Sequence, residues 1–377
     1  MKTIMFPGQG SQSKEMGAGL FDRYPELTAK ADRILGYSIK ELCMEDPRDE
    51  LGNTRFTQPA LYVVNALSYY KKLEETGQAP DFLAGHSLGE FNALLAAECY
   101  DFETGLKLVQ KRGELMSQVS NGAMAAVLNA SKDDIEGILK ANGLTQIYLA
   151  NYNTPSQIVL SGLSEEIAAV QKFFQTGKMR YYPLATSGAF HSAFMQDAME
   201  KFRDFLKEFT FAAPKIPVIA NVTARPYRAD AMQGTLSAQI ASTVRWSESV
   251  QYLLALGRSR GEAPVFEELG HGDVLTKLVM TIKLQTPEPV LDQLIKDGLQ
   301  ADAVPILASA PIKLTDAQEK IALWKKMHPV GTRVKSSLLN LDNLETRTDA
   351  VLLFGHRAAV YLKGYNGYFA LDELTPM

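Results

Sequence analysis

The hydrophobic positions of the chain form two kinds of segment: short runs that are wholly apolar, and longer stretches with helical spacing. Apolar runs at residues 3–6 and 82–84 predict two buried strands, each of which ends at a glycine-containing turn. Helical spacing over residues 58–67 and 88–97 predicts two helices. The second strand, its turn and the helix that follows form a succession typical of α/β proteins.

The pattern changes between about residues 122 and 190. Strands alternate here with amphipathic helices in the order strand, helix, strand, strand, helix, strand. That order suggests an inserted ferredoxin-like subdomain. The predicted strands are residues 124–128, 147–150, 158–161 and 181–184, and the predicted helices are residues 131–142 and 165–174.

The α/β style returns after this insertion, and the end of the chain is different again. Apolar runs at residues 218–222 and 265–270 belong to the α/β part, and a polar helix is predicted at residues 316–327. Beyond it the sequence is β-rich, with apolar runs at 351–354 and 358–362 and a Tyr-Asn-Gly-Tyr hairpin turn at residues 365–368.

The predicted fold class is therefore α/β with attachments. We expect a hydrolase-like large subdomain with a parallel sheet, an inserted ferredoxin-like small subdomain, a helical linker and a small β-rich module. The respective ranges are 1–121 with 191–287, 122–190, 288–328 and 329–377. The segment beyond residue 287 fits an interaction module, a linker to a former fusion partner, or a cap on the main domain, and the pattern does not choose among them.

The composition narrows the class of protein. The chain has 377 residues, 46% hydrophobic and 22% charged, which is ordinary for a globular protein able to hold a buried cleft. A net charge of −4 and a pI near 5.9, without a dense Lys/Arg cluster, argue against a nucleic-acid binder. No uncharged apolar run approaches the roughly 18 residues of a membrane span, and the first is too short for a signal peptide. We expect a soluble cytoplasmic monomer.

The cysteines and histidines give no sign of a metal. Cys43 and Cys99 are the only cysteines, which suggests neither a disulfide framework nor a metal site and fits a reducing compartment. The five histidines lie far apart in the sequence, and none pairs with another at metal-ligand spacing. We expect no metal and no cofactor.

Residues 85–89 read Gly-His-Ser-Leu-Gly, which fits the nucleophile-elbow pattern Gly-x-Ser-x-Gly. The two glycines allow a strand to turn tightly into a helix and expose the hydroxyl of Ser87. The backbone N–H of Leu88, at the start of the helix, would favour a developing negative charge. The alternative interpretation is a purely structural turn.

A serine nucleophile needs a base, because its hydroxyl is a poor nucleophile at neutral pH. His86 adjoins Ser87, but neighbours on a tight turn usually point in different directions. His191 is the better candidate, although a single histidine is often structural. No acid that would orient the base is evident in the sequence.

Two further residues are unremarkable alone. Arg112 fits a solvated helix position, but in a cleft its planar guanidinium would suit a carboxylate-bearing acyl group. A side-chain amide at Gln9, beside the elbow, would complete an oxyanion hole.

Five motifs in one order give these residues a common context. They read Phe-Pro-Gly-Gln-Gly-Ser-Gln at residues 6–12, His-Ser-Leu-Gly-Glu at 86–90, Lys-Arg-Gly at 111–113, Asn-Tyr-Asn-Thr-Pro-Ser-Gln-Ile-Val-Leu-Ser-Gly at 151–162 and Gly-Ala-Phe-His-Ser at 188–192. From residue 1 to about 285, the chain resembles the malonyl-CoA:acyl-carrier-protein transacylase family. It is most similar to the discrete acyltransferases that serve polyketide synthases.

The resemblance implies a two-step ping-pong reaction. Ser87, activated by His191, would take the malonyl group from malonyl-CoA and pass it to the phosphopantetheine thiol of an acyl carrier protein. In this family a backbone carbonyl orients the histidine. Gln9 and the Leu88 N–H would form the oxyanion hole, and Arg112 would pair with the malonyl carboxylate.

The same resemblance suggests residues of the acyl pocket. Phe190 matches a position where family members specific for malonyl carry a bulky aromatic, so we expect malonyl over methylmalonyl. Gly188 departs from the histidine that modular malonyl-specific enzymes often have there. Met116 and Asn153 are further pocket candidates, and His271 is expected in a variant turn.

Two other functions remain open at this point. An acyl hydrolase that removes stalled acyl chains from carrier proteins would use the same serine and histidine. A hydrolase for neutral acyl groups would, however, have no use for a buried guanidinium at Arg112. A non-catalytic scaffold that binds carrier proteins would have no reason to keep Ser87 and His191 in these contexts.

Overall fold

A computed structural model describes residues 1–186, 188–299, 316–337, 341–353, 357–364 and 368–377. Its contacts divide the chain into two compact units. The first comprises Met1–Ala18, Ala31–Ala66 and Pro80–Val304, and the second comprises Gly19–Lys30, Leu67–Ala79 and Pro305–Met377. In the described part of the chain, no helix combines the length and the hydropathy that crossing a membrane requires.

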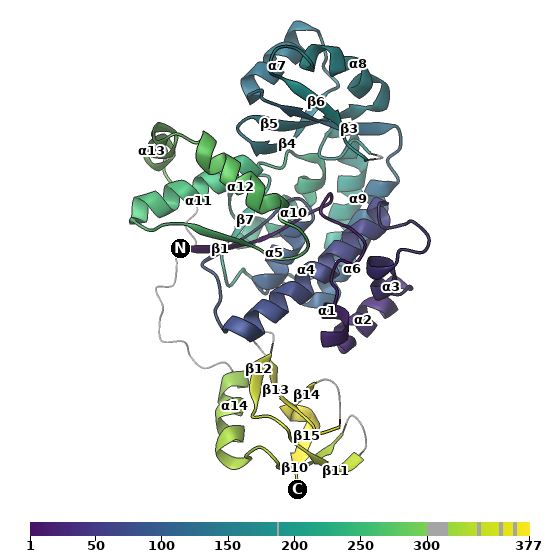
Figure 1. Ribbon diagram of the computed structural model, residues 1–377, viewed down its shortest axis with the longest axis vertical. Coiled ribbons are helices and arrows are strands. Elements are labelled where there is room, and N and C mark those ends of the chain that lie inside the picture. Colours follow the sequence, from purple (N-terminus) through teal and green to yellow (C-terminus); the bar gives the residue numbers. More distant parts are fainter. Residues whose placement is uncertain (187, 300–315, 338–340, 354–356, 365–367) are drawn as a thin grey trace. The chain divides into compact units, whose positions relative to one another are not determined.

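A five-stranded sheet in the order β8-β7-β2-β1-β9 lies at the centre of the first unit (Figure 1). The contacts of β1 with β2 and β9, and of β2 with β7, are parallel. Only the short strand β8 is antiparallel to its neighbour. The strands are β1 (Lys2–Phe6), β2 (Phe82–Gly85), β7 (Val218–Ala220), β8 (Arg225–Pro226) and β9 (Val265–Glu268).

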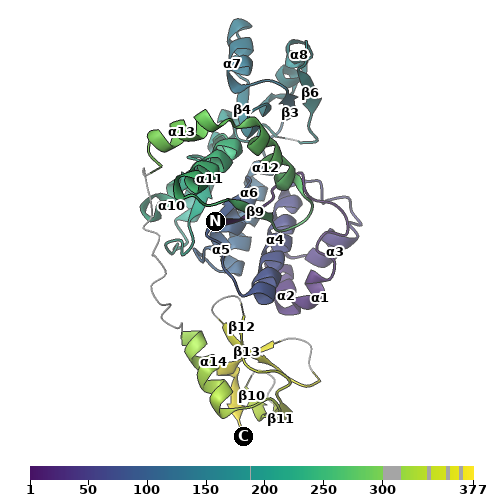
Figure 2. The same cartoon turned by 60° about the vertical axis from the view of Figure 1, so that its left-hand side comes forward.

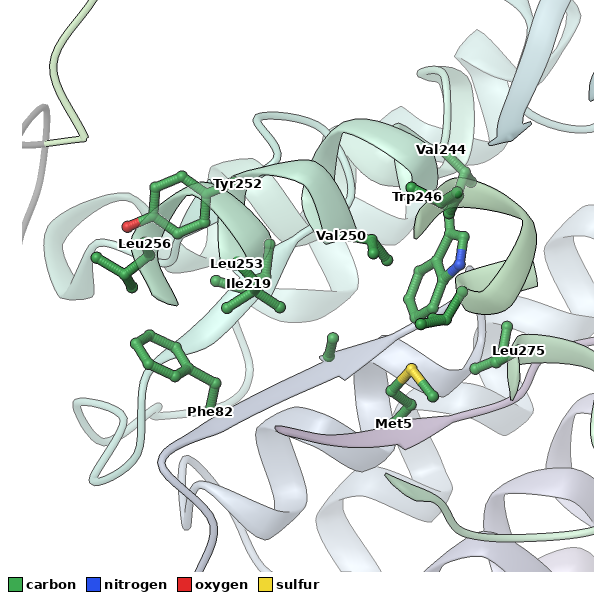
Figure 3. Close-up of a cluster of buried hydrophobic side chains, with 13 residues drawn as sticks. Met5, Phe82, Ile219, Val244, Trp246, Val250, Tyr252, Leu253, Leu256 and Leu275 are labelled. Carbon is green, nitrogen blue, oxygen red and sulfur yellow. The ribbon is translucent and has the colours of Figure 1, made fainter. Parts of the chain in front are cut away.

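Helix α11 (Trp246–Arg260) covers one face of this sheet through a buried apolar cluster (Figure 3). Trp246 at the start of the helix is fully buried and lies over Met5 of β1, and Leu253 packs near Ile219 of β7. Burial of such large side chains contributes about 1.5–3 kcal/mol each, so the cluster fixes the helix firmly on the strands. Helix α5 follows β2 directly and contacts β1, β2 and β7.

A four-stranded antiparallel sheet, seen with its two helices in Figure 2, forms the small part of the first unit. Its order, β4-β5-β3-β6, and the chain order of its elements are those of a ferredoxin-like fold. Both helices pack on one face of the sheet in a single apolar cluster. The elements are β3 (Gly122–Leu128), α7 (Lys132–Ala141), β4 (Tyr148–Thr154), β5 (Gln157–Leu163), α8 (Ser164–Phe174) and β6 (Arg180–Pro183).

The two sheets of the first unit are joined through β4. The Tyr152 amide donates to the carbonyl of Val244 (2.9 Å), and the Val244 amide donates to the carbonyl of Ala150 (2.8 Å). Val244 lies two residues before α11, so these bonds tie the small sheet to the helix that covers the large one.

Most of the helices that the structure describes belong to the first unit. In the first unit, α3, α5, α6 and α9 to α13 are wholly included, while α2 and α4 span both units. Their bounds are α2 (Pro25–Leu35), α3 (Ile39–Met44), α4 (Thr54–Thr76), α5 (Gly89–Ala96), α6 (Phe102–Ser117), α9 (Gln196–Leu206), α10 (Met232–Ala238), α11 (Trp246–Arg260), α12 (Val274–Gln285) and α13 (Glu288–Lys296).

The second unit contains two three-stranded sheets, β11-β10-β15 and β12-β13-β14. Trp324 of its helix α14 joins Val334, Val360 and other residues in a separate small core. Its elements are α1 (Leu20–Arg23), α14 (Asp316–Met327), β10 (Arg333–Ser336), β11 (Leu341–Glu345), β12 (Val351–Leu353), β13 (Arg357–Tyr361), β14 (Tyr368–Ala370) and β15 (Leu374–Pro376).

The predicted fold class is confirmed, and the differences in detail have local causes. The strand predicted at residues 218–222 ends at Ala220, because the next amide, that of Asn221, donates to the carboxylate of Glu90 (2.9 Å). Of the hairpin turn predicted at residues 365–368, residues 365–367 lie outside the described residues and Tyr368 begins β14. The strands on either side, β13 and β14, are antiparallel neighbours.

Candidate active site

Ser87 lies in the turn between β2 and α5, with its backbone in the left-handed region at φ 51°. The flanking glycines make this turn possible. A Cβ at Gly85 would lie 2.0 Å from the backbone of Gly89, and one at Gly89 would lie 2.0 Å from the carbonyl oxygen of Phe6. Since left-handed backbone is unfavourable for a serine, the surrounding contacts must hold it there.

Two side chains form hydrogen bonds with the backbone of this turn. The Asn221 side chain accepts from the Ser87 amide (2.8 Å) and donates to the carbonyl of Gly85 (2.7 Å). The Gln239 side chain donates to the carbonyl of Ser87 (2.8 Å). Both side chains are buried, so these hydrogen bonds satisfy backbone groups of the turn that water cannot reach.

His191 lies beside the serine, and a backbone carbonyl on the other side of its ring orients it. Its Nε2 lies 2.8 Å from Ser87 Oγ, and its Nδ1 lies 2.9 Å from the carbonyl oxygen of Gln239. Because a carbonyl can only accept, Nδ1 carries the proton and Nε2 is free to accept one from the serine. Burial, together with the nearby Arg112 cation, lowers the pKa of His191 to about 3, so the ring is neutral at physiological pH.

His86, the other candidate base, is directed elsewhere. Its Nε2 lies 2.9 Å from Asn153 Oδ1, and its ring packs against Trp246 with 5.6 Å between centroids. Burial lowers the pKa of His86 as well. His86 therefore connects the elbow to β4, the strand that carries Asn153.

Arg112 projects from α6 toward the serine and is only 1% exposed. Its Nη2 donates to Ser87 Oγ (3.2 Å) and to Gln239 Oε1 (2.8 Å), and its Nη1 donates to Gln58 Oε1 (2.8 Å). Burial lowers the pKa of Arg112 to about 10, which leaves the guanidinium charged at neutral pH. Among the described residues its Nε has no hydrogen-bond partner.

A buried carboxyl group lies behind this arrangement. Glu90 has no exposed surface, and it accepts hydrogen bonds from the Tyr227 hydroxyl, the Asn221 amide (2.9 Å) and the Gln239 side-chain amide (3.1 Å). Burial raises its pKa to about 7, while these donors and the Arg112 cation oppose the rise.

The sequence suggests Leu88 and Gln9 as donors of an oxyanion hole. Leu88 is the residue that precedes the first turn of α5, and a Cβ at Gly8 would come within 3.5 Å of its nitrogen. The side-chain amide of Gln9 donates to Thr54 (3.1 Å). The Gln9 side chain, which the sequence suggests as an oxyanion donor, is thus engaged with Thr54. In the described part of the chain, no hydrogen bond uses the backbone N–H of Gln9 or of Leu88, so both N–H groups are free to donate.

The three predicted pocket residues, Met116, Phe190 and Asn153, differ from one another in their surroundings. Met116 is buried one turn after Arg112, and its sulfur accepts from the amide of Gln58 (3.4 Å). Phe190 is buried immediately before His191, and a Cβ at Gly188 would lie 2.4 Å from its ring. A residue with a side chain at position 188 would displace this ring, which accounts for the glycine found there. Asn153 is hydrogen-bonded to His86 of the elbow (2.9 Å).

Four polar residues of the site carry no signal in the sequence: Gln58, Asn221, Tyr227 and Gln239. Each is an ordinary polar residue outside the five motifs. Each is recognisable only because the fold buries it: Asn221 and Gln239 bind the elbow, Gln58 binds Arg112, and Tyr227 binds Glu90. Glu90 lies within a motif, yet its role is equally invisible before its partners are known. Among the described residues, no group of His, Cys, Asp or Glu could hold a metal ion. His271 Nε2 lies 2.7 Å from Ser13 Oγ, in a turn between two glycines with positive φ.

Comparisons with known proteins are consistent across the first three quarters of the chain. The chain matches the family described as "Acyl transferase domain" over residues 3–302. It is 53% identical over 285 residues to the polyketide biosynthesis malonyl CoA-acyl carrier protein transacylase PksC of Bacillus subtilis, covering 75% of this chain and 97% of the relative. The corresponding protein BaeC of Bacillus velezensis is 50% identical over 288 residues, covering 76% and 98%.

A solved structure shows the same similarity. The malonyl CoA-acyl carrier protein transacylase from Burkholderia pseudomallei is 62% identical and superposes with a TM-score of 0.75, covering 76% of this chain and 99% of that chain.

The low pKa of His191 gives a testable pH profile. The base is the neutral ring, which persists above a pKa of about 3. The rate at which a neutral sulfonyl fluoride labels Ser87 is therefore expected to stay level from pH 8 down to pH 5. Replacement of His191 by alanine should reduce that rate by about 10²- to 10⁴-fold. A half-maximal rate near pH 6.5, the ordinary value for histidine, would contradict the buried environment described above.

Proposed function

Because the chain belongs to the acyl transferase domain family, we propose that it transfers malonyl groups from malonyl-CoA to the phosphopantetheine thiol of an acyl carrier protein in polyketide biosynthesis. The resemblance expected from the sequence is confirmed by relatives named for that transfer. The observation that carries the proposal is the buried Arg112 cation 3.2 Å from Ser87 Oγ. Such a cation suits an acyl group that itself bears a carboxylate.

In the proposed first step, Ser87 Oγ attacks the thioester carbon of malonyl-CoA while its proton passes to Nε2 of His191. A carbon–oxygen bond forms, and the carbonyl oxygen becomes an oxyanion that the backbone N–H groups of Leu88 and Gln9 can stabilise. The carbon–sulfur bond then breaks, and His191 returns the proton to the sulfur of coenzyme A. Support for these roles comes from the 2.8 Å contact of Ser87 with His191.

The second step repeats the chemistry with a different thiol. Coenzyme A leaves, and the thiol of the carrier protein's phosphopantetheine gives its proton to His191 and attacks the malonyl-serine ester. The carbon–oxygen bond breaks, and the proton passes from His191 to Ser87 Oγ. Both chemical steps use only groups of the protein and its two substrates. We propose that no cofactor is needed and that malonyl-CoA enters as a substrate.

Recognition of the carboxylate would also strengthen the base. The positive charge of Arg112 is the second cause of the low pKa of His191, after burial. A malonyl carboxylate paired with the guanidinium would cancel part of that charge and raise the pKa of His191 toward its ordinary value. The correct acyl group would thus improve the proton acceptor, while a neutral acyl group would leave both the cation and the weak base unchanged.

The remaining assignments are proposals of the same kind. Phe190, buried beside His191, would limit the space for an α-methyl group and favour malonyl over methylmalonyl. Met116 would line the pocket through its contact with Gln58, and Asn153 would act on it through His86. We also propose the subdomain boundaries 1–121 with 191–287, 122–190, 288–328 and 329–377. The two buried free thiols, Cys43 and Cys99, support a reducing compartment such as the cytoplasm.

A transfer assay separates this function from hydrolysis. Incubated with labelled malonyl-CoA and a holo carrier protein, the protein should place label on the carrier faster than it releases free malonate. The Ser87→Ala variant should do neither, and a carrier that lacks phosphopantetheine should receive no label. Rapid release of malonate without transfer would establish an acyl hydrolase instead.

The role of Arg112 predicts a selective loss. In Arg112→Ala, kcat/KM for loading Ser87 with malonyl should fall about 10- to 100-fold more than for acetyl, because a hydrogen bond to a charged group contributes about 1.5–3 kcal/mol. The matched control is Arg203→Ala, an exposed arginine on α9, for which neither value should change. An equal loss for malonyl and acetyl would remove Arg112 from carboxylate recognition.

A further inference from the structure

The buried guanidinium of Arg112 is not in contact with any carboxylate among the residues that the structure describes. Its three hydrogen bonds all go to neutral oxygens: those of Gln58, Ser87 and Gln239. A buried charge is costly unless another charge compensates it, and neutral acceptors compensate it only in part. A compensating negative charge must therefore lie within a short distance.

Glu90 supplies that charge through one intervening side chain. The Gln239 side chain accepts from Arg112 Nη2 (2.8 Å) through its oxygen and donates to Glu90 Oε2 (3.1 Å) through its nitrogen. The amide dipole is thus aligned between the cation and the carboxylate, with its negative end toward the cation. The charge of Glu90 opposes the fall in the pKa of Arg112 that burial causes.

The other ionisable groups near Glu90 do not titrate near neutral pH. These groups are Tyr227, which follows β8, and Cys99 and Tyr100, which follow α5. Tyr227 donates a hydrogen bond to Glu90, and the charge of Glu90 helps to raise the pKa of Tyr100. Cys99 lies close to both tyrosines. Burial raises the pKa of each tyrosine well above its usual value and that of Cys99 to about 12. Around neutral pH, the charge of this cluster therefore changes only at Glu90, whose pKa burial raises to about 7.

We propose that Glu90 is the resident counter-anion of Arg112 and that it takes up a proton when the carboxylate of a malonyl group binds to Arg112. This inference rests on the proposed function and deepens it. One buried cation can balance one carboxylate, and a second carboxylate nearby is driven toward its protonated form. The proton comes from solvent and binds to the Glu90 carboxylate. A neutral acyl group brings no second charge and leaves Glu90 ionised.

Proton uptake can be measured directly. The Ser87→Ala variant, which cannot be acylated, is titrated with malonyl-CoA in buffers of different ionisation enthalpy. The heat difference between buffers gives the number of protons taken up. Acetyl-CoA is the matched ligand, because it carries the same coenzyme phosphates, which also titrate near pH 6. The quantity of interest is the uptake for malonyl-CoA minus the uptake for acetyl-CoA.

The expected difference depends on pH with a definite sign. At pH 8 Glu90 is ionised in the empty site, so binding should draw in about one proton. Near pH 5.5 Glu90 is already protonated, and the difference should approach zero. In the active protein, KM for malonyl-CoA should correspondingly rise above pH 7, by up to about tenfold per pH unit.

Two variants identify Glu90 as the group. Glu90→Gln keeps the shape but cannot ionise, so the difference in uptake should vanish at every pH and KM should lose its rise above pH 7. Tyr227→Phe removes a hydrogen bond that lowers the pKa of Glu90, so the midpoint of the uptake profile should move to higher pH. If Glu90→Gln does not fold, the shift in Tyr227→Phe decides the question.

The contrary results are distinct from a failure of the proposed function. Equal uptake for malonyl-CoA and acetyl-CoA, undiminished uptake in Glu90→Gln, or an unmoved midpoint in Tyr227→Phe would each overturn the counter-anion role. Malonyl transfer to the carrier protein would still stand in each case. Absence of malonyl transfer by the unaltered protein would instead reject the function itself.

Discussion

The left-handed backbone of Ser87 is the constraint on which the rest of the site depends. Its hydroxyl lies within hydrogen-bonding distance of His191 and Arg112, but this backbone conformation is unfavourable for a residue with a Cβ. Two glycines make the turn sterically possible, and the buried side chains of Asn221 and Gln239 hold its amide and carbonyl groups. These clamping residues come from segments more than 130 residues further along the chain. The elbow is therefore formed only when the whole large sheet and its connections are assembled.

Gln239 links this mechanical constraint to the electrostatics of the site. Its backbone carbonyl orients His191, its side-chain oxygen holds Arg112, and its side-chain nitrogen reaches both Ser87 and Glu90. The base, the cation and the nucleophile consequently share one rigid support. A change in charge at Arg112 is felt at His191 and at Glu90, because all three groups are buried where charges interact strongly.

Much of this could be predicted from the sequence because it depends on local patterns. The elbow strand, its glycines, the ferredoxin-like order of elements and the family resemblance all follow from short segments or ordered motifs. The supporting residues Asn221, Tyr227 and Gln239 could not be predicted, since they are common polar residues without a distinctive spacing. Nor could the sequence show that the side chain of Gln9 would bind Thr54. Such pairings are set by tertiary packing, which single-sequence periodicity does not encode.

The central claim is that Ser87 holds a malonyl group whose carboxylate lies against Arg112. A crystal structure of the protein trapped after reaction with malonyl-CoA, in the absence of a carrier protein, tests this most directly. We predict continuous density from Ser87 Oγ, with the carbonyl oxygen of the ester facing the backbone amides of Leu88 and Gln9 and the carboxylate within hydrogen-bonding distance of the guanidinium. An acyl group that points its carboxylate into solvent, or one attached to a different residue, would contradict the account.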